Sequence, residues 1–225
     1  MCNLYSQTKG QEAIRKLAGV MRDTTGNLRP LPGIFPDKLA PVVRNAPGGV
    51  RELAMLRWGM PSPPAFLKPG AIDQGVTNIR NTGSPHWRGW LGPANRCIVP
   101  ATSFCEPSTL PDPASGLKIW TWFALADERP LFFFAGLWCA WHGVRGTKKS
   151  RDAGEHQLYG FLTTTPNGTV KPVHEKAMPV ILRTPEEIDV WMNAPARVAL
   201  ELQRPLPDDA LKIVLRDAKE DAIAA

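Results

Sequence analysis

The chain has 225 residues and a mass of 24.7 kDa, a length that favours a single domain. Its composition, 43% hydrophobic and 21% charged, is typical of a folded globular protein and excludes intrinsic disorder. No apolar run approaches the roughly 20 residues that a membrane span requires, so we expect none. The 27 Lys and Arg exceed the 21 Asp and Glu, and the net charge of +6 favours an anionic partner such as nucleic acid.

The spacing of cysteines and histidines argues against a metal centre. The four cysteines form no CxxC pair and the four histidines are scattered, so we expect no metal site. The first ten residues lack the charged start and apolar stretch of a signal peptide. This predicts a cytoplasmic protein whose thiols remain reduced.

The N-terminal third predicts a helix, a hairpin and a loop. A capping box at residues 8–11, followed by apolar residues at helical spacing, predicts a short helix. Two apolar runs, 39–43 and 53–58, flank a Pro-Gly-Gly turn and predict a hairpin. Four prolines within 60–70 remove too many amide donors for a helix or a central strand, so this segment is expected to be a surface loop.

The remainder predicts mainly strands. Ser84-Pro85 predicts a short helix through Trp90, and a capping box at 184–187 predicts another through Trp191. Runs of aromatic and branched residues predict strands over 96–104, 117–126, 131–141, 157–164 and 211–215.

These elements together indicate one α+β domain over residues 1–225. We expect a curved, mostly antiparallel sheet or partly closed β-barrel with a few short helices. The tail after Arg216 is expected to be frayed.

Cys2 directly follows the initiator methionine. Removal of Met1 would place an α-amine and a thiol on one residue, with reference pKa values near 8 and 8.5. Such a pair condenses with aldehydes to a thiazolidine ring, or attacks carbonyls as an N-terminal nucleophile. Taken alone, a cysteine at this position also fits an incidental small residue.

Three further positions suggest chemistry. Asn78 and Arg80 share one face of an extended segment, and their amide and guanidinium suit an anionic ligand. Glu106 ends an apolar strand, where burial would raise its pKa toward that of a general acid or base. His174 precedes another apolar strand and can move protons near neutral pH. Singly, each also fits an ordinary structural or surface role.

Tryptophans near arginines leave two interpretations open. Trp58, Trp87 and Trp90, with Arg57 and Arg88 beside them, fit either core packing or stacking on bases beside bound phosphates.

Taken together, these residues resemble the SOS response-associated peptidase (SRAP) family, which shields abasic sites in single-stranded DNA by covalent capture. The resemblance runs over nearly the whole chain, and several motifs occur in one order. They are Met1-Cys2-Asn3, Leu39-Ala40-Pro41, Arg57-Trp58-Gly59, Thr77-Asn78-Ile79-Arg80, the run from Arg96-Cys97-Ile98-Val99-Pro100-Ala101 through Phe104-Cys105-Glu106, and His174-Glu175-Lys176-Ala177-Met178-Pro179-Val180-Ile181-Leu182.

The resemblance implies that Met1 is removed by self-cleavage and that Cys2 captures the opened sugar of an abasic site. A thiazolidine DNA-protein crosslink would result, with possible reversal and lyase activity. Asn78 would hold Cys2 and the sugar, Glu106 would transfer protons, and His174 would help to open the deoxyribose ring.

The resemblance also implies the partners and the DNA-binding positions. The partner would be single-stranded DNA containing abasic sites, bound by a monomer without a metal or organic cofactor. We expect the protein in the cytoplasm and on the nucleoid when bound to DNA. The implied DNA-binding residues are Arg80, Arg88, Pro41, Trp58 and Lys176.

Some positions depart from the family pattern. Leu4 replaces a common arginine, Pro107 replaces a common tryptophan, and Lys176 replaces a common arginine, while one extra residue precedes Pro179. Two other functions remain open. One is an N-terminal-nucleophile amidohydrolase, which the scarcity of predicted helices disfavours. The other is a non-catalytic single-strand-binding module that would form no covalent adduct.

Overall fold

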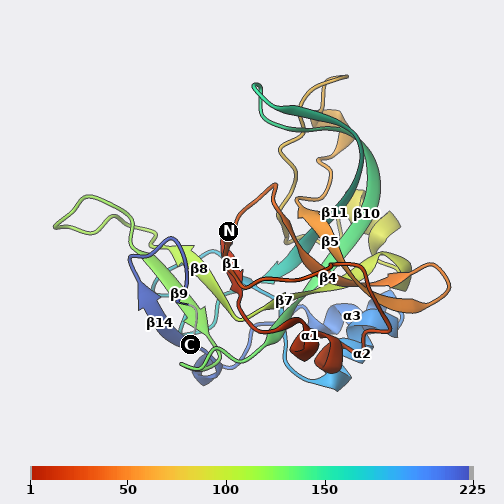
Figure 1. The fold of residues 1–225 in the computed structure, drawn as a ribbon. Helices are drawn as coiled ribbons and strands as arrows, with labels where there is room; N and C mark the ends of the chain where they lie inside the picture. The colour runs from red at the N-terminus through yellow and green to blue at the C-terminus, as the bar shows by residue number, and fades with distance from the viewer. Residues whose placement is uncertain (1, 223–225) are drawn as a thin grey trace.

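The structure, a computed structural model, describes residues 2–222 and consists mainly of β-strands (Figure 1). The strands are β1 (Tyr5–Gln7), β2 (Arg22–Asp23), β3 (Leu31–Ile34), β4 (Leu39–Ala46), β5 (Val50–Trp58), β6 (Asn78–Ile79), β7 (Arg96–Ala101), β8 (Ser103–Pro107), β9 (Trp120–Ala124), β10 (Phe132–Gly146), β11 (Arg151–Thr164), β12 (Met178–Pro179), β13 (Ile181–Leu182) and β14 (Lys212–Arg216). The helices are α1 (Gln11–Ala18), α2 (Pro185–Asn193) and α3 (Ala196–Ala199), and the 3₁₀ turns are η1 (Pro64–Phe66), η2 (Pro85–Trp90), η3 (Pro93–Asn95), η4 (Leu200–Leu202) and η5 (Asp208–Ala210).

Five strands close into a barrel. β4 pairs antiparallel with β5 and β7, β7 pairs with β10, and β10 pairs with β11. β11 then runs parallel to β5, with Tyr159 opposite Trp58, and this pairing completes the ring. The expected α+β fold on a curved, mostly antiparallel sheet is therefore confirmed, and the barrel is closed.

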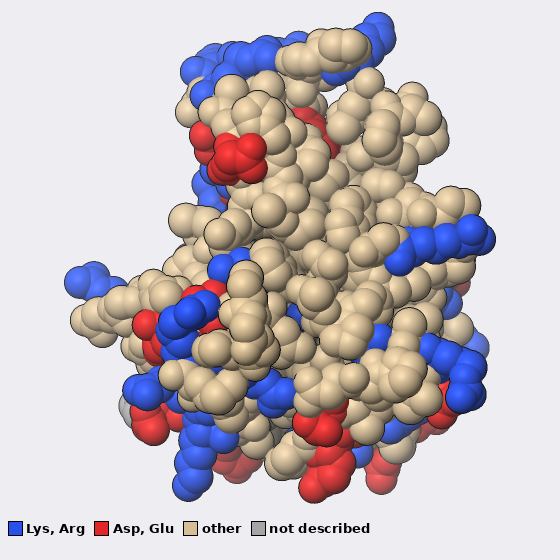
Figure 2. Space-filling view, turned by 90° about the vertical axis from the view of Figure 1, so that its right-hand side faces the viewer, with Lys and Arg blue, Asp and Glu red and all other residues tan. Residues whose placement is uncertain are grey.

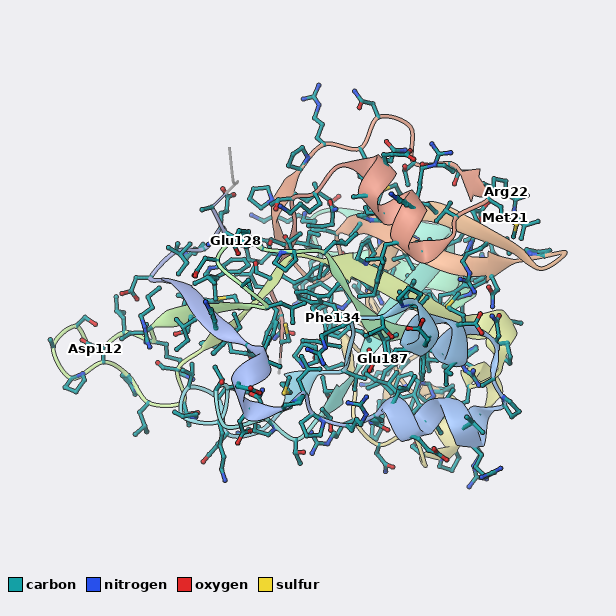
Figure 3. The ribbon with its side chains drawn as sticks, turned by 90° about the horizontal axis from the view of Figure 1, so that it is seen from below. Met21, Arg22, Asp112, Glu128, Phe134 and Glu187 are labelled. Atoms are coloured by element: carbon teal, nitrogen blue, oxygen red, sulfur yellow. The ribbon has the colours of Figure 1, made fainter. Side chains whose placement is uncertain are left out.

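A second sheet, in the order β14-β9-β8-β1-β3, lies beside the barrel and shares its core. Tyr5 of β1 makes edge contacts with Trp58 and Phe134, with ring centroids 5.2 and 5.5 Å apart, and its hydroxyl lies 2.6 Å from that of Tyr159. Figure 3 shows Phe134 at the centre of the molecule. The N-terminal strand β1, which belongs to the second sheet, thus packs its Tyr5 side chain into the core of the barrel (Figure 1).

The helices cover the other side of the barrel. α1, α2 and α3 lie below it in Figure 1, where Ile14 and Ile188 are buried against Val43 and Ile98. On the side away from these helices, a loop projects between β8 and β9, and Figure 3 shows Asp112 at its tip. No helix within residues 2–222 is long and apolar enough to cross a membrane.

The structure confirms the 39–58 hairpin, in which Ala46 faces Val50 across the turn. The 8–11 capping box is wrong: Gly10 occupies the N-cap of α1 without a side-chain bond, and the Thr8 hydroxyl lies 3.2 Å from that of Thr102. The single strand expected over 96–104 is also divided, because the Thr102 amide turns to donate to the Ser6 carbonyl at 2.8 Å.

The expectation of a frayed tail is wrong for residues 217–222. Asp221 is buried and forms an ion pair with Arg129 at 2.8 Å, because a carboxylate deep in the protein needs a charged partner. Residues 223–225 lie outside the described part of the chain.

The second expected capping box is present in part at α2: the N-cap side chain of Thr184 accepts as expected, but the Glu187 carboxylate binds the amide one residue before the N-cap. The Glu187 amide donates to Thr184 Oγ1 at 3.2 Å, and the Arg183 amide donates to Glu187 Oε2 at 2.7 Å. Thr184→Ala should lower the free energy of unfolding by about 1 kcal/mol, because the Glu187 amide loses its acceptor. Urea unfolding measures this, with Thr184→Ser as the control that retains the hydroxyl. An equal loss in both variants would assign the effect to the methyl group instead of the cap.

Candidate active site

Four residues that the sequence singles out meet where the barrel adjoins the second sheet. Cys2 precedes β1, Asn78 opens β6, Glu106 lies in β8, and His174 lies in the turns before β12. All four are buried. Since these elements are far apart in the chain, the site exists only once the barrel and the second sheet have assembled.

Asn78 holds the backbone of Cys2. Its Nδ2 donates to the Cys2 carbonyl at 2.8 Å and to Thr77 Oγ1 at 2.8 Å, while the Thr77 hydroxyl donates to Asn3 Oδ1 at 3.1 Å. β6 itself is fixed by parallel pairing with β11, where Asn78 faces Phe161. The amide therefore anchors the N-terminal residue to the barrel wall.

Glu106 has no exposed surface and lies against the Cys2 thiol. Burial raises the pKa of this carboxyl to about 8, although its hydrogen bond with Cys2 partly opposes the rise. Glu106 Oε2 also lies 3.9 Å from His174 Nε2. Near neutral pH the group is mainly a protonated acid, able to give a proton to a neighbour and to take one back.

The Cys2 thiol is fully buried in this state. Its Sγ lies 3.5 Å from the Leu4 carbonyl, to which it donates. Burial, followed by the negative charge that Glu106 would carry, raises the pKa of the thiol well above its ordinary value. The sulfur is therefore held as a thiol until a base accepts its proton. The expected loss of Met1 lies outside the described residues.

His174 is held neutral beside the carboxyl group. Burial lowers its pKa, the positive charges of Lys176 and Lys118 lower it further, and a hydrogen bond with the Pro107 backbone acts in the opposite direction. Its amide donates to the Val170 carbonyl at 2.9 Å. A neutral imidazole can both donate and accept a hydrogen bond, as a proton carrier must.

The sequence did not single out Lys118, whose positive charge helps to lower the pKa of His174. This lysine lies in the loop before β9, and that loop carries no motif that would identify it. A cavity of about 430 Å³ is lined by residues next to His174 in the chain, Pro172 and Glu175, and by Ser108, Thr109 and Lys171 among others.

Arg145 is a second residue that the sequence did not reveal. Its fully buried guanidinium lies 3.1 Å from Asp37 and 3.8 Å from Asp73. It fits only because Gly59 and Gly75, both at positive φ, have no Cβ, which would stand 2.6 and 2.5 Å from it. This contact fixes the chain segment that leads into Asn78.

The structure separates the expected DNA-binding residues into two groups. Arg80, Arg88 and Lys176 are exposed, and for these three the role remains a prediction. Trp58 is fully buried, with Nε1 donating to the Thr77 carbonyl at 3.2 Å, and Pro41 is buried within β4. Both side chains are enclosed in the folded barrel and present no surface to a base in this structure, and their DNA-binding role also stays a prediction.

Two of the positions that depart from the family pattern, Leu4 and Pro107, lie in or beside the second sheet. Leu4 is buried with Cys105 and Trp122, in a cluster separate from the core that contains Cys2. Pro107 faces Trp120 of β9 across the strand pair. Leu4 is therefore part of the packing of the second sheet and presents no charge to the site.

Positive charge gathers at one end of the molecule. Figure 2 shows Lys and Arg over its upper end, where the tip of the β10–β11 hairpin and the preceding loop carry exposed Lys68, Lys148, Lys149 and Arg151. An aromatic-lined cavity of about 630 Å³ lies on this side, between residues 61–71, η2 and β10, and contains none of the four site residues. We place the chemistry at the buried cluster, because that is where reactive groups and shifted pKa values coincide.

Comparison with known proteins identifies relatives. A family model described as SOS response associated peptidase (SRAP) matches residues 1–216. A solved structure of a Bordetella bronchiseptica protein is 24% identical, with 96% of this chain and 98% of that chain covered and a TM-score of 0.68. A phage-related protein of the same organism has 23% identity, 94% and 92% coverage and a TM-score of 0.68. A Bacteroides thetaiotaomicron protein has 20% identity, 94% and 90% coverage and a TM-score of 0.68. At these identities the structures share the fold. Among curated protein sequences, none matches.

The raised pKa of Glu106 predicts how stability depends on pH. Between its ordinary value of 4.5 and about 8, the carboxyl keeps its proton only in the folded chain. Rising pH therefore favours the unfolded chain, and wild type should lose about 1.4 kcal/mol per pH unit in this window relative to Glu106→Gln, which cannot ionise. Urea unfolding across the window measures the difference. Glu201→Gln, which removes an exposed carboxylate, is the control, and parallel wild-type and Glu106→Gln curves would contradict the assignment.

Proposed function

Because the chain belongs to the SOS response associated peptidase family, we propose that it captures abasic sites in single-stranded DNA as a thiazolidine crosslink through Cys2. The observation that carries the proposal is the contact of three groups, a thiol, a carboxyl with a pKa of about 8 and a neutral imidazole, around the second residue. The peptidase activity in the family's description would then be the hydrolysis that removes Met1 and frees the Cys2 amine.

The first chemical step is the opening of the sugar. His174 would donate a hydrogen bond to the ring oxygen O4′ of the deoxyribose; the C1′–O4′ bond would break, O4′ would gain a proton, and the C1′ hydroxyl would lose one to become the aldehyde. The freed Cys2 amine would then attack C1′, and protonated Glu106 would supply the proton with which the hydroxyl leaves as water. The product of this step is an imine between Cys2 and the DNA.

Ring closure completes the capture. The Cys2 sulfur would add to the imine carbon while its proton passes by way of Glu106 to the nitrogen. An aldehyde and an aminothiol thereby give a thiazolidine and one water, and reversal would return that water. Asn78 supports both steps because its bond to the Cys2 carbonyl fixes amine and thiol in one place, which lowers the entropic cost of the reaction.

Binding of the strand would fall to the exposed cations around the buried cluster. Arg80 lies two residues after Asn78, Arg88 lies in η2, and the charges of Lys118 and Lys176 act on His174. Contacts with phosphates carry no sequence information. This arrangement suits a lesion that has lost its base and can occur in any sequence.

Removal of the thiol tests the covalent step. Wild type mixed with an oligonucleotide containing one abasic site should give a heat-stable band on a denaturing gel, with the intact mass of a chain that starts at Cys2. Cys2→Ala should lose this adduct, because its amine can form only a reversible imine. Cys139→Ala, which removes a buried thiol of β10, is the matched control and should behave as wild type. A heat-stable adduct of Cys2→Ala at the wild-type rate would refute the thiazolidine.

Removal of cations tests the DNA path. Arg80→Ala and Arg88→Ala should weaken binding to strands of any sequence and reduce the slope of log affinity against log salt by about 0.7 for each phosphate that the variant no longer neutralises. Fluorescence anisotropy with undamaged strands at several salt concentrations measures this without the covalent step. Lys16→Ala on α1 is a control for the removal of one exposed charge. Unchanged slopes in both arginine variants would place the DNA elsewhere.

A further inference from the structure

The C-terminal segment 217–222 crosses the second sheet. It starts beside β9, where the Asp217 amide donates to the Trp120 carbonyl and Trp122 Nε1 donates to the Ala218 carbonyl, each at 2.8 Å. It then lies on β3, because a Cβ on Gly33 would stand 3.3 Å from the carbonyl oxygen of Lys219. In the order β14-β9-β8-β1-β3, a path from β9 to β3 passes over β8 and β1.

Asp221 fastens this segment at β1 and β8. Its Oδ2 accepts from Ser103 Oγ at 2.5 Å and from Ser6 Oγ at 3.4 Å, and the two serine oxygens lie 2.7 Å apart. Arg129 Nε donates to both carboxylate oxygens, at 2.9 and 2.8 Å, and the Asp221 amide donates to the Pro32 carbonyl at 2.9 Å. The carboxylate itself has no exposed surface.

The two serines form a register pair in the strands that carry the reactive groups. Ser6 faces Ser103, and Tyr5 faces Phe104. Cys2 lies four residues before Ser6, and Glu106 lies three residues after Ser103. A slip of one residue between these strands would turn Glu106 away from the thiol, since side chains alternate between the two faces of a sheet.

β1 needs such support because it is short. It has three residues, and its pairing with β3 is already irregular between Tyr5 and Gln7. β1 pairs with β8 at Tyr5 and Ser6, and just before β1 the Cys105 amide donates to the Leu4 carbonyl at 2.9 Å. A charged group bonded to both strands at once adds a constraint that the short backbone ladder lacks.

We propose that residues 217–222 are a C-terminal clasp that positions Cys2 against Glu106, with Asp221 as the positioning residue. The clasp lies beyond the region that the family model matches, which ends at residue 216. The inference rests on the proposed function for its kinetic test. The exposure of the thiol provides a test that does not depend on that function.

The first experiment measures the reactivity of the thiol without DNA. Native protein is alkylated with iodoacetamide, and mass spectrometry follows Cys2 and Cys139 separately, both being buried in the wild type. Asp221→Asn keeps the shape of the side chain but removes the charge that binds Arg129. Local opening of β1 should raise the alkylation rate of Cys2 about 10-fold and leave Cys139 unchanged.

Two controls separate positioning from general loss of stability. Asp209→Asn removes an exposed carboxylate from η5 and should alter neither rate. Ile188→Val trims a buried side chain of α2, remote from the clasp, and should lower the melting temperature without selective exposure of Cys2. Equal rises at Cys2 and Cys139 in Asp221→Asn, or no rise at either, would overturn the clasp.

The second experiment measures crosslinking to an abasic oligonucleotide. In Asp221→Asn the rate at saturating protein should fall about 10-fold or more, while the half-saturating concentration stays within about twofold, because the clasp orders the reacting groups and not the DNA contacts. The upper pH limit of the reaction should also move down, because water admitted beside Glu106 would relax its raised pKa.

The outcomes distinguish the two proposals. A wild type that forms no crosslink defeats the proposed function, and the alkylation result then decides the clasp by itself. A rate loss that Ile188→Val reproduces with the same pH profile would reduce Asp221 to an ordinary stabilising residue. A chain ending at Arg216 should match Asp221→Asn in both assays, and wild-type behaviour of that chain would overturn the clasp.

Discussion

The candidate site depends on the burial of the Glu106 carboxyl group. Loss of hydration disfavours the charged form of any group, and here the same cause acts on three neighbours. It raises the pKa of Glu106 and of the Cys2 thiol and lowers that of His174. All three are therefore driven toward their neutral forms. A cluster of neutral groups with protons to exchange can be buried at little electrostatic cost, whereas the same groups in their charged forms could not.

The fold provides this burial by placing Cys2 between the barrel and the second sheet. The closed barrel supplies one wall through β6 and β11, and the second sheet supplies the other through β8. Tyr5 joins the walls through its edge contacts with Trp58 and Phe134 and through its hydroxyl beside that of Tyr159. Cys2 lies three residues before Tyr5 and is buried in the same hydrophobic cluster. The packing that joins the two sheets therefore also encloses the nucleophile.

The sequence predicted what is encoded locally. Turn residues, prolines and aromatic runs placed the hairpin, most strands and the α2 N-cap, and the order of motifs singled out the four residues that lie together in the structure. It could not decide which face of a strand is enclosed. Trp58 was therefore expected to contact DNA, although closure of the barrel buries it. It also could not reveal partners far apart in the chain, as in the contact of Asp221 with Ser6 or of Arg145 with Asp37 and Gly75. Such pairs exist only in the folded molecule.

The buried groups of the site are neutral, whereas the cations around it are exposed, so salt and pH should act on different residues. Dissolved ions screen exposed charges, such as those of Arg80, Arg88 and Lys176, but act weakly on groups without solvent contact. Salt should therefore act on the association with DNA. Protons act on the buried site instead, where Glu106 changes its charge near pH 8. In the proposed reaction, affinity and chemistry are thus governed by separate sets of residues, and a change in one set need not disturb the other.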